Sequence, residues 1–430
     1  MITLSADWLA TQWPGLRTNG IIPIPLSVWD DGDCYTLASL GPLGAGRTVF
    51  GAVVLRGGQT ADAKVRVVLT PSTDHRPSPA QGYQSPDGDW YTAEGQVDVN
   101  GRPTAVPVKI VEIAKALDER RTSLLESALL KDRTVLVIGL GTGGAQVAVE
   151  LAKAGVGKFI LIDPDRLDVG NVGRHLAGIS HAGRYKVHTM KDLLAEKNPS
   201  IVTEPYPVSV NHENLEIVRG LVHKADLVIG ATDGRASKLL INRICVEERK
   251  PVIFGGAFRR AYGGQALRVR PGQSACYHCF VMAMPEREAD SEISSDEDAQ
   301  ATAYTDRPVA VEPGLALDVA PIALMMAKLA LQELLVGKSS ALHVLDRDFR
   351  EVWYLWINRP EPKTEYAALP PLGDSVDSMT ILRWYGIQLS RDPGCPTCGD
   401  LEGALRRTYD LQDPHLPAPQ EVPLPPGLRN

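Results

Sequence analysis

The chain has 430 residues, a formal net charge of −7 and six cysteines. Its length predicts two or three domains, and its acidic balance without a long basic stretch disfavours nucleic acid as a main partner. No apolar segment is long enough to cross a membrane, because the longest, residues 320–335, is interrupted by Lys328. The first residues lack the basic start and apolar run of a secretory signal, and six cysteines do not predict a disulfide framework in so long a chain. We therefore expect a cytoplasmic protein that does not associate with membranes.

Residues 1–105 differ in their sequence pattern from the rest of the chain. Short apolar runs such as TVFGAVVL and KVRVVL alternate with turns rich in glycine and proline, and Asn100-Gly101 is a strong signal for a two-residue hairpin. This pattern predicts a small β-rich N-terminal domain. It contains Cys34 and His75 without a metal or nucleophile constellation around either one, which favours a structural or docking role over chemistry.

From about Pro107 the pattern becomes helical up to Leu130, and strands and helices then alternate. Such alternation predicts an α/β fold, a Rossmann-like doubly wound and mostly parallel sheet covered by helices on both faces, within residues 106–400. The expected strands lie near 135–140, 159–163, 201–210, 225–233 and 251–257, and the expected helices near 144–154, 184–196, 213–222 and 236–247.

Two segments look poorly structured. Residues 286–300 are acidic and polar, which predicts a solvated and mobile loop. Residues 401–430 form a proline-rich C-terminal tail that we expect to be extended. Docking of this tail onto a partner is an alternative to its having no role.

The strongest functional signal begins at the first strand of the α/β region. Gly139, Gly141 and Gly144 form a G-x-G-x-x-G turn between strand and helix, where backbone N–H groups and the helix N-terminus approach a phosphate. Asp163 ends the next strand, at the distance where an acidic residue binds a ribose hydroxyl. A glycine motif alone is weak evidence for any particular nucleotide. The residues that follow it distinguish a nicotinamide nucleotide from a nucleoside triphosphate.

Polar and charged side chains follow this turn in an order that favours a nucleoside triphosphate. Arg174 and Lys186 can neutralise phosphate oxygens, and Asn171 can donate an amide hydrogen bond without adding charge. Asp233 follows an apolar strand, where a carboxylate suits Mg²⁺. Taken singly, these are a surface arginine, a helix-surface lysine, a turn-forming asparagine and a helix-capping aspartate. Their combination disfavours a nicotinamide dehydrogenase and predicts an ATP site.

Four of the six cysteines form two C-x-x-C pairs, which predict a metal site. Cys276, Cys279, Cys395 and Cys398 supply four thiolates for a closed structural zinc site, provided that the fold brings the distant pairs together. The alternative is a redox-active pair or four idle cysteines. His278 is expected to be a bystander, since four sulfurs complete the coordination.

These motifs resemble those of the ThiF/MoeB superfamily, which includes the ubiquitin-activating enzymes. The resemblance covers residues 107–400 and rests on the glycine turn, Asp163, the D-x(5)-N-x-x-R run from Asp165 to Arg174, GRYK ending at Lys186, ATD ending at Asp233, Asn242 and the paired C-x-x-C motifs.

The resemblance implies an adenylation domain that binds a ubiquitin-like protein, joins its C-terminal glycine to AMP and releases pyrophosphate. It implies that Asp163 holds the ribose of ATP, that Asn171, Arg174 and Lys186 hold its phosphates, and that Asp233 holds Mg²⁺. It further implies a homodimer in which Arg120 or Arg121 of one subunit reaches the ATP of the other.

The sequence departs from the superfamily pattern at two places. A motif often written N-x-N-R-Q has Gly173 and His175 in place of its second asparagine and its glutamine, and Lys238 stands where members often carry an arginine. The segments around the first strand are similar to those of bacterial ubiquitin-like conjugation systems, some of which act in antiviral defence.

The acceptor of the activated group is left open by the cysteines. Cys245 lies on the apolar face of a predicted helix, and residues 282–314, where ubiquitin-activating enzymes tend to place a thioester cysteine, contain none. We favour formation of an acyl-adenylate followed by capture on a cysteine of a ubiquitin-conjugating-like enzyme. The alternatives are activation of a sulfur-carrier protein for thiamin or molybdenum-cofactor synthesis, and a non-catalytic scaffold.

Overall fold

In the computed structural model of the protein, residues 127–284, 314–361 and 381–400 are described in full. Before residue 127 the description comprises eight strands between Ile2 and Val111 and a few isolated residues. The predicted acidic loop at 286–300, the tail at 401–430, Cys34, His75 and the Asn100-Gly101 turn lie outside the described residues.

A sheet of eight strands forms the centre of the α/β region, in the order β11-β10-β9-β12-β13-β14-β15-β16. The first five strands in this order run parallel, and the last three pairings are antiparallel. Their bounds are β9 Thr134–Ile138, β10 Lys158–Ile162, β11 Val202–Tyr206, β12 Leu227–Gly230, β13 Val252–Ala257, β14 Gly263–Val269, β15 Trp353–Ile357 and β16 Arg383–Ile387. The chain order reverses between β9 and β12, which is where open α/β sheets bind ligands.

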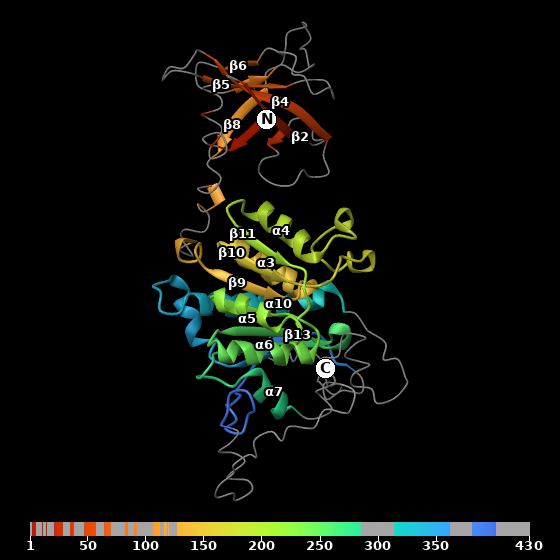
Figure 1. Cartoon of the computed structure of the whole chain (residues 1–430), viewed down its shortest axis with the longest axis vertical. Coiled ribbons are helices and arrows are strands. Elements are labelled where there is room, and N and C mark those ends of the chain that lie inside the picture. The colour runs from red at the N-terminus through yellow and green to blue at the C-terminus, as the bar shows by residue number, and fades with distance from the viewer. Residues whose placement is uncertain are drawn as a thin grey trace, which may run out of the picture.

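Helices cover both faces of this sheet, and Figure 1 shows them running beside its strands. Alternate residues of β9 point to opposite faces, so Val135 and Val137 pack with α3, α4 and α10, whereas Leu136 and Ile138 pack with α5, α6 and α7. The helices are α3 Thr142–Ala154, α4 Lys186–Lys197, α5 Leu215–Lys224, α6 Arg235–Glu247, α7 Tyr277–Ala283 and α10 Ala316–Leu334. Burial on both faces explains why β9 and β12 are apolar throughout.

The predicted α/β alternation is confirmed, with each helix and strand between residues 134 and 257 within a few residues of its expected position. The predicted helix from Pro107 is wrong at its beginning, because Val106–Val111 forms strand β8. Three β-branched valines and Ile110 favour a strand, and pairing with β1 and β7 supplies its hydrogen-bond partners. Residues 127–129 form only a short 3-10 helix.

The N-terminal strands form a second sheet, in the order β5-β4-β2-β3-β1-β8-β7-β6. Their bounds are β1 Ile2–Ser5, β2 Ile21–Val28, β3 Tyr35–Leu37, β4 Arg47–Arg56, β5 Lys64–Leu69, β6 Gly82–Gln84, β7 Trp90–Thr92 and β8 Val106–Val111. The strand-rich character predicted for this region is therefore present, and its sheet extends six residues past the predicted boundary at residue 105. Among the described residues, no helix has the length and apolarity needed to cross a membrane.

Candidate functional site: a nucleotide cavity beside a four-cysteine cluster

A cavity of 520 Å³ lies at the carboxyl ends of the parallel strands. Its walls come from the loops after β9, β10, β12 and β13 and from the N-terminal half of α10. The lining includes every nucleotide-binding residue predicted from the sequence within the described ranges except Gly144, which lies behind the turn. The carboxyl ends of parallel strands meet at one edge of the sheet, which explains why residues far apart in sequence converge here.

Each of the three glycines of the turn lacks a side chain for a different structural reason. Gly139 has φ +88°, and a Cβ there would lie 2.6 Å from the carbonyl oxygen of Ala231. A Cβ on Gly144 would lie 1.9 Å from the carbonyl oxygen of Gly139, so the helix packs directly against the turn. A Cβ on Gly141 would meet no atom within 4 Å, and Gly141 is the N-cap of α3 with no side-chain hydrogen bond to the helix. Gly141, Thr142 and Gly143 line the cavity, so the N-terminus of α3 opens into it, as phosphate binding requires.

Asp163 and Lys186 form the polar floor of the cavity. Both oxygens of the Asp163 carboxylate accept backbone hydrogen bonds, one from Leu140 N at 2.6 Å and one from Asp165 N at 2.9 Å. Burial raises the pKa of the Asp163 carboxyl, and the charge of Lys186 opposes that effect. The Lys186 ammonium lies 2.7 Å from Asp165 and 3.9 Å from Asp163. The two carboxylates thus hold the Lys186 ammonium in the cavity, where a phosphate oxygen could also bind it.

Arg174 is oriented by its predicted neighbour. Its Nε and one terminal nitrogen both donate to Oδ1 of Asn171, at 3.2 and 2.8 Å. Among the described residues this is the only hydrogen-bond partner of the Arg174 guanidinium, which therefore keeps free donors toward the cavity. Asn171 therefore positions the Arg174 side chain by accepting its hydrogen bonds, a role that was not predicted from the sequence.

His175 links the glycine turn to the arginine loop. Its Nδ1 accepts a hydrogen bond from Ala177 N at 3.0 Å, so its Nε2 carries the proton and donates to the carbonyl of Leu140 at 2.9 Å. Burial lowers the pKa of this histidine, which keeps it neutral. A glutamine side chain also carries both a donor group and an acceptor, as the two contacts made by His175 require.

Asp233 follows β12 and lines the cavity. The N-cap of α6 is Gly234 and the helix has no side-chain cap, which excludes the capping alternative for Asp233. Within the part of the chain that the structure describes, its exposed carboxylate makes no hydrogen bond or ion pair. A free carboxylate beside a phosphate-binding turn fits Mg²⁺, which takes one or two protein carboxylates and leaves its other positions to water and phosphate.

The sequence did not reveal the opposite wall of the cavity. This wall combines β13 with α10 and includes Gly255, Gly256, Ala323 and Met326. A Cβ on Gly255 would lie 2.1 Å from the sulfur of Met326, so α10 rests directly on the strand. The Gly255-Gly256 pair is the sequence signal that could have indicated such a close approach, although no close approach was predicted from it.

The four cysteines of the C-x-x-C pairs form one buried cluster, as predicted. Their sulfurs all lie within 4.8 Å of one another, although the pairs are 119 residues apart. The sulfur–sulfur distances are 3.9 Å for Cys276–Cys279, 3.6 Å for Cys276–Cys395 and 3.3 Å for Cys279–Cys398. Tetrahedral zinc with Zn–S bonds of about 2.3 Å places its sulfurs about 3.8 Å apart. The donor set and its spacing therefore fit zinc.

Asn242 provides an independent test of that fit. This residue is fully buried, its Oδ1 accepts from Tyr277 N at 2.9 Å, and its Nδ2 has no hydrogen-bond partner among the described residues. A hydrogen bond from the Cys276 thiol lowers the pKa of the Cys279 thiol, which favours the thiolate form that zinc binds. Thiolates accept hydrogen bonds better than thiols do, and the orphaned amide next to the cluster suits a site loaded with metal. His278 bonds to Thr397 and is not part of the four-cysteine cluster.

The remaining predicted residues fall in two groups. Cys245 is completely buried in the core, as its position on an apolar helix face predicted, and burial raises the pKa of its thiol. Lys238 is also buried, on the same helix α6. Arg120 and Arg121 lie outside the described residues.

The sequence model of the ThiF family matches residues 120–349, just over half of the chain. The chain belongs to the ThiF family. This confirms the resemblance that the motifs indicated.

This ThiF-family chain is similar to several curated proteins. It is 34% identical over 164 residues to "Adenylyltransferase and sulfurtransferase UBA4" of Candida albicans, covering 37% of this chain and 36% of that protein. It is 30% identical over 158 residues to "Ubiquitin-like modifier-activating enzyme 5" of Caenorhabditis briggsae, covering 35% and 37%. The chain thus spans about a third of the length of the curated relatives it matches. Among solved structures, E. coli MccB is similar over 64% of this chain and 67% of its own, with 19% identity and a TM-score of 0.45.

Proposed function

We propose that this protein is an adenylyltransferase that activates the C-terminal glycine of a ubiquitin-like protein with ATP and Mg²⁺. The observation that supports this most is the cavity itself. The glycine turn lines the same cavity as Arg174 and Lys186, two cations that can bind phosphate oxygens. Asp233 also lines this cavity, and its carboxylate has no ion-pair partner among the described residues. A site for a nicotinamide nucleotide has no use for this combination.

The reaction follows from the charges in the cavity. A carboxylate oxygen of the substrate attacks the α-phosphorus of ATP, the bond from that phosphorus to the bridging oxygen breaks, and pyrophosphate leaves. The attacking carboxylate is ionised at pH 7, because the pKa of a chain terminus is about 3.3–3.7. No general base is needed, and His175 has both ring nitrogens engaged.

The described residues act by alignment and fixed charge. Arg174 and Lys186 offset the repulsion between the carboxylate and the triphosphate and stabilise the charge that develops on pyrophosphate. The N-terminus of α3 receives phosphate oxygens, and Asp163 holds the ribose. Mg²⁺, held by Asp233, supplies further positive charge to the phosphates when bound.

We further propose that the four-cysteine cluster holds zinc and that transfer proceeds to a cysteine of a ubiquitin-conjugating-like partner. Among the described residues no cysteine lines the cavity, and Cys245 is inaccessible in the core. Activation of a sulfur-carrier protein is the second candidate, which the similarity to the Candida albicans protein favours.

The wider setting is also a proposal. The β-rich N-terminal region, which includes strand β8 up to Val111, has a structural or docking role; the residues after it up to 400 form the adenylation domain, and residues 401–430 form a tail. The enzyme acts as a homodimer in which Arg120 or Arg121 completes the site of the other subunit. The sequence around the first strand supports a place in a bacterial ubiquitin-like conjugation system, with antiviral defence as one role for such systems.

The test is exchange of labelled pyrophosphate into ATP, with Mg²⁺ and a panel of ubiquitin-like and sulfur-carrier proteins that end in glycine. We expect exchange with one of them, its loss on removal of the terminal glycine, and its loss in Asp233→Ala. Asp132→Ala is the matched control, because Asp132 is an exposed acid that does not line the cavity. Binding of ATP without exchange for any member of the panel would favour the scaffold.

A further inference from the structure

A second cavity, of 690 Å³, lies at the opposite edge of the sheet from the nucleotide cavity. Pro251, the residue directly before strand β13, lines this second cavity, and Ala257 at the end of β13 lines the first. Helix α10 contributes to both, with Ile322 to the first and Gln332 to the second. The second cavity is therefore a separate site, and the mechanism proposed above does not use it.

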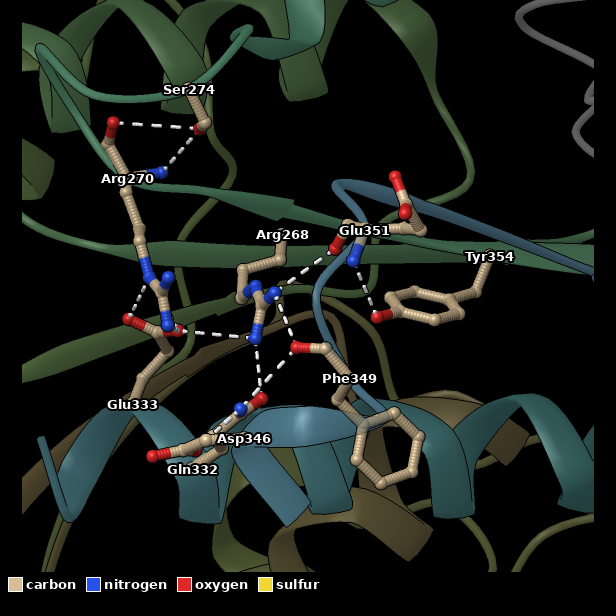
Figure 2. Close-up of polar contacts among 9 residues, drawn as sticks. All are labelled: Arg268, Arg270, Ser274, Gln332, Glu333, Asp346, Phe349, Glu351 and Tyr354. Atoms are coloured by element: carbon tan, nitrogen blue, oxygen red, sulfur yellow. Dashed lines mark hydrogen bonds and ion pairs between the residues drawn. The ribbon is translucent and has the colours of Figure 1, made fainter. Parts of the chain in front are cut away.

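The floor of this cavity is a hydrogen-bonded network that Figure 2 shows. Arg268 of β14 is buried and donates to Oε1 of Gln332 and to the carbonyls of Phe349 and Glu351, the last two at 2.9 and 3.0 Å. The amide nitrogen of Gln332 donates in turn to Asp346 at 2.7 Å. Because these partners come from three segments of the chain, the network holds the floor rigid before any ligand arrives.

The cavity carries more positive than negative charge. Arg268 and Arg270 share the single carboxylate of Glu333, which lies 3.6 Å from the first guanidinium and 2.6 Å from the second (Figure 2). Burial, and then the nearby charge of Arg270, lower the pKa of Arg268. The whole lining contains four arginines against two carboxylates, with His343 in addition.

Two of these arginines, Arg249 and Arg350, are exposed and make no side-chain hydrogen bond or ion pair within the described part of the chain. Arg249 also occupies a strained position, with φ +55° directly after helix α6. The hydrogen bonds from Arg249 N to Val246 O and from Lys250 N to Cys245 O form the helix-ending motif whose left-handed residue is usually glycine. An arginine at this position carries backbone strain that glycine would avoid, and its side chain lines the cavity.

We propose that this second cavity is a binding site for a small anion with two or more negative charges, either a phosphate ester or a polycarboxylate. Guanidinium groups match phosphate and carboxylate oxygens through paired N–H donors, which both ligand classes share. The volume lies within the range of about 300–1,000 Å³ that is typical of sites for small molecules, which argues against a macromolecular occupant. Arg249 and Arg350 supply the free donors, Arg270 is held beside them by its ion pair with Glu333, and the Arg268 network holds the wall behind them.

The experiment titrates the full-length protein with inorganic phosphate and, separately, with citrate, by calorimetry at about 50 mM salt, where screening is modest. The test variants are Arg249→Gly and Arg350→Gln. Arg249→Gly is informative because glycine suits the left-handed position, so its melting temperature is expected to be unchanged or higher. We expect each variant to weaken binding of the preferred probe at least ten-fold. If phosphate binds more strongly than citrate, the ligand is a phosphate ester, and if citrate binds more strongly, it is a polycarboxylate.

Two control variants make the result specific. Arg347→Gln removes an equally exposed arginine three residues before Arg350 that does not line the cavity, and it is expected to bind as wild type does. Lys186→Met alters the nucleotide cavity and is expected to leave this binding unchanged, so the result does not depend on the proposed adenylation. The proposal is overturned if the wild type binds neither probe, or if Arg249→Gly and Arg350→Gln bind as tightly as Arg347→Gln.

Discussion

Two glycines of the same turn are expected to fail in different ways when replaced by alanine. In Gly139→Ala, the new Cβ would lie 2.6 Å from Ala231 O and 2.9 Å from Thr232 N, on a backbone with φ +88°. The left-handed backbone costs about 1–2 kcal/mol and the overpacking about 1–3 kcal/mol. A loss of about 3 kcal/mol in the free energy of unfolding corresponds to a fall of roughly 6–12 °C in melting temperature for a domain of this size.

Gly141→Ala is the matched variant, because its Cβ would meet no atom within 4 Å. Alanine in place of glycine at the N-cap costs about 0.5–1 kcal/mol, so we expect a fall of only about 1–4 °C in melting temperature. The methyl group would instead occupy the space above the N-terminus of α3, where a phosphate approaches. Loss of one hydrogen bond to a charged group, worth about 1.5–3 kcal/mol, weakens ATP binding roughly 10- to 150-fold.

The assays are differential scanning fluorimetry for stability and calorimetry with a non-hydrolysable ATP analogue for affinity. Gly139→Ala should melt early, whereas Gly141→Ala should fold and bind poorly. If Gly141→Ala binds ATP as tightly as the wild type, the phosphate does not lie at the helix N-terminus. If Gly139→Ala melts as the wild type does, the close contact with Ala231 is not rigid.

Three further predictions address other parts of the site. Burial lowers the pKa of His175 in the folded protein. The neutral imidazole therefore stabilises the fold fully above pH 6.5, the ordinary pKa of histidine, and this stabilisation is lost as the pH falls through the lower pKa of the folded state. Melting temperatures measured from about pH 7.5 to 5 should fall more steeply for the wild type than for His175→Gln. Cys395→Ser should reduce bound zinc, measured by mass spectrometry, from one equivalent to near zero and should lower the melting temperature; equal zinc content would refute the four-sulfur site. Cys245→Ala should cost about 1 kcal/mol of stability and leave pyrophosphate exchange and transfer to the partner intact, whereas loss of transfer alone would identify Cys245 as the acceptor.

The sequence was informative wherever the physical cause is local. The apolar run before Gly139 predicted β9 because a strand buried on both faces has no polar positions. The glycine turn was readable because a left-handed residue and a close helix approach exclude side chains. The order of Asn171, Arg174 and Lys186 after that turn placed them at one edge of the sheet, where the structure has them.

The prediction of a helix from Pro107 shows where local reasoning stops. Residues 107–130 have apolar residues at helical spacing, yet Val106–Val111 pairs with β1, more than one hundred residues earlier in the chain. The antiparallel strands β14, β15 and β16 were not predicted for the same reason. A short apolar run does not indicate which neighbour will satisfy its backbone hydrogen bonds.

By itself the sequence determined the α/β alternation, the glycine turn, the candidate residues for ATP and the choice of the paired cysteines as candidate metal ligands. These depend on residue type, spacing and the conformations that each residue allows. Only the tertiary structure decided that His175 is a neutral bridge, that Asp233 caps no helix, and that the cysteine pairs meet across 119 residues. It alone revealed the arginine-rich second cavity. The physical reason is that hydrogen-bond partners and charge compensation depend on distances between segments, and folding sets those distances.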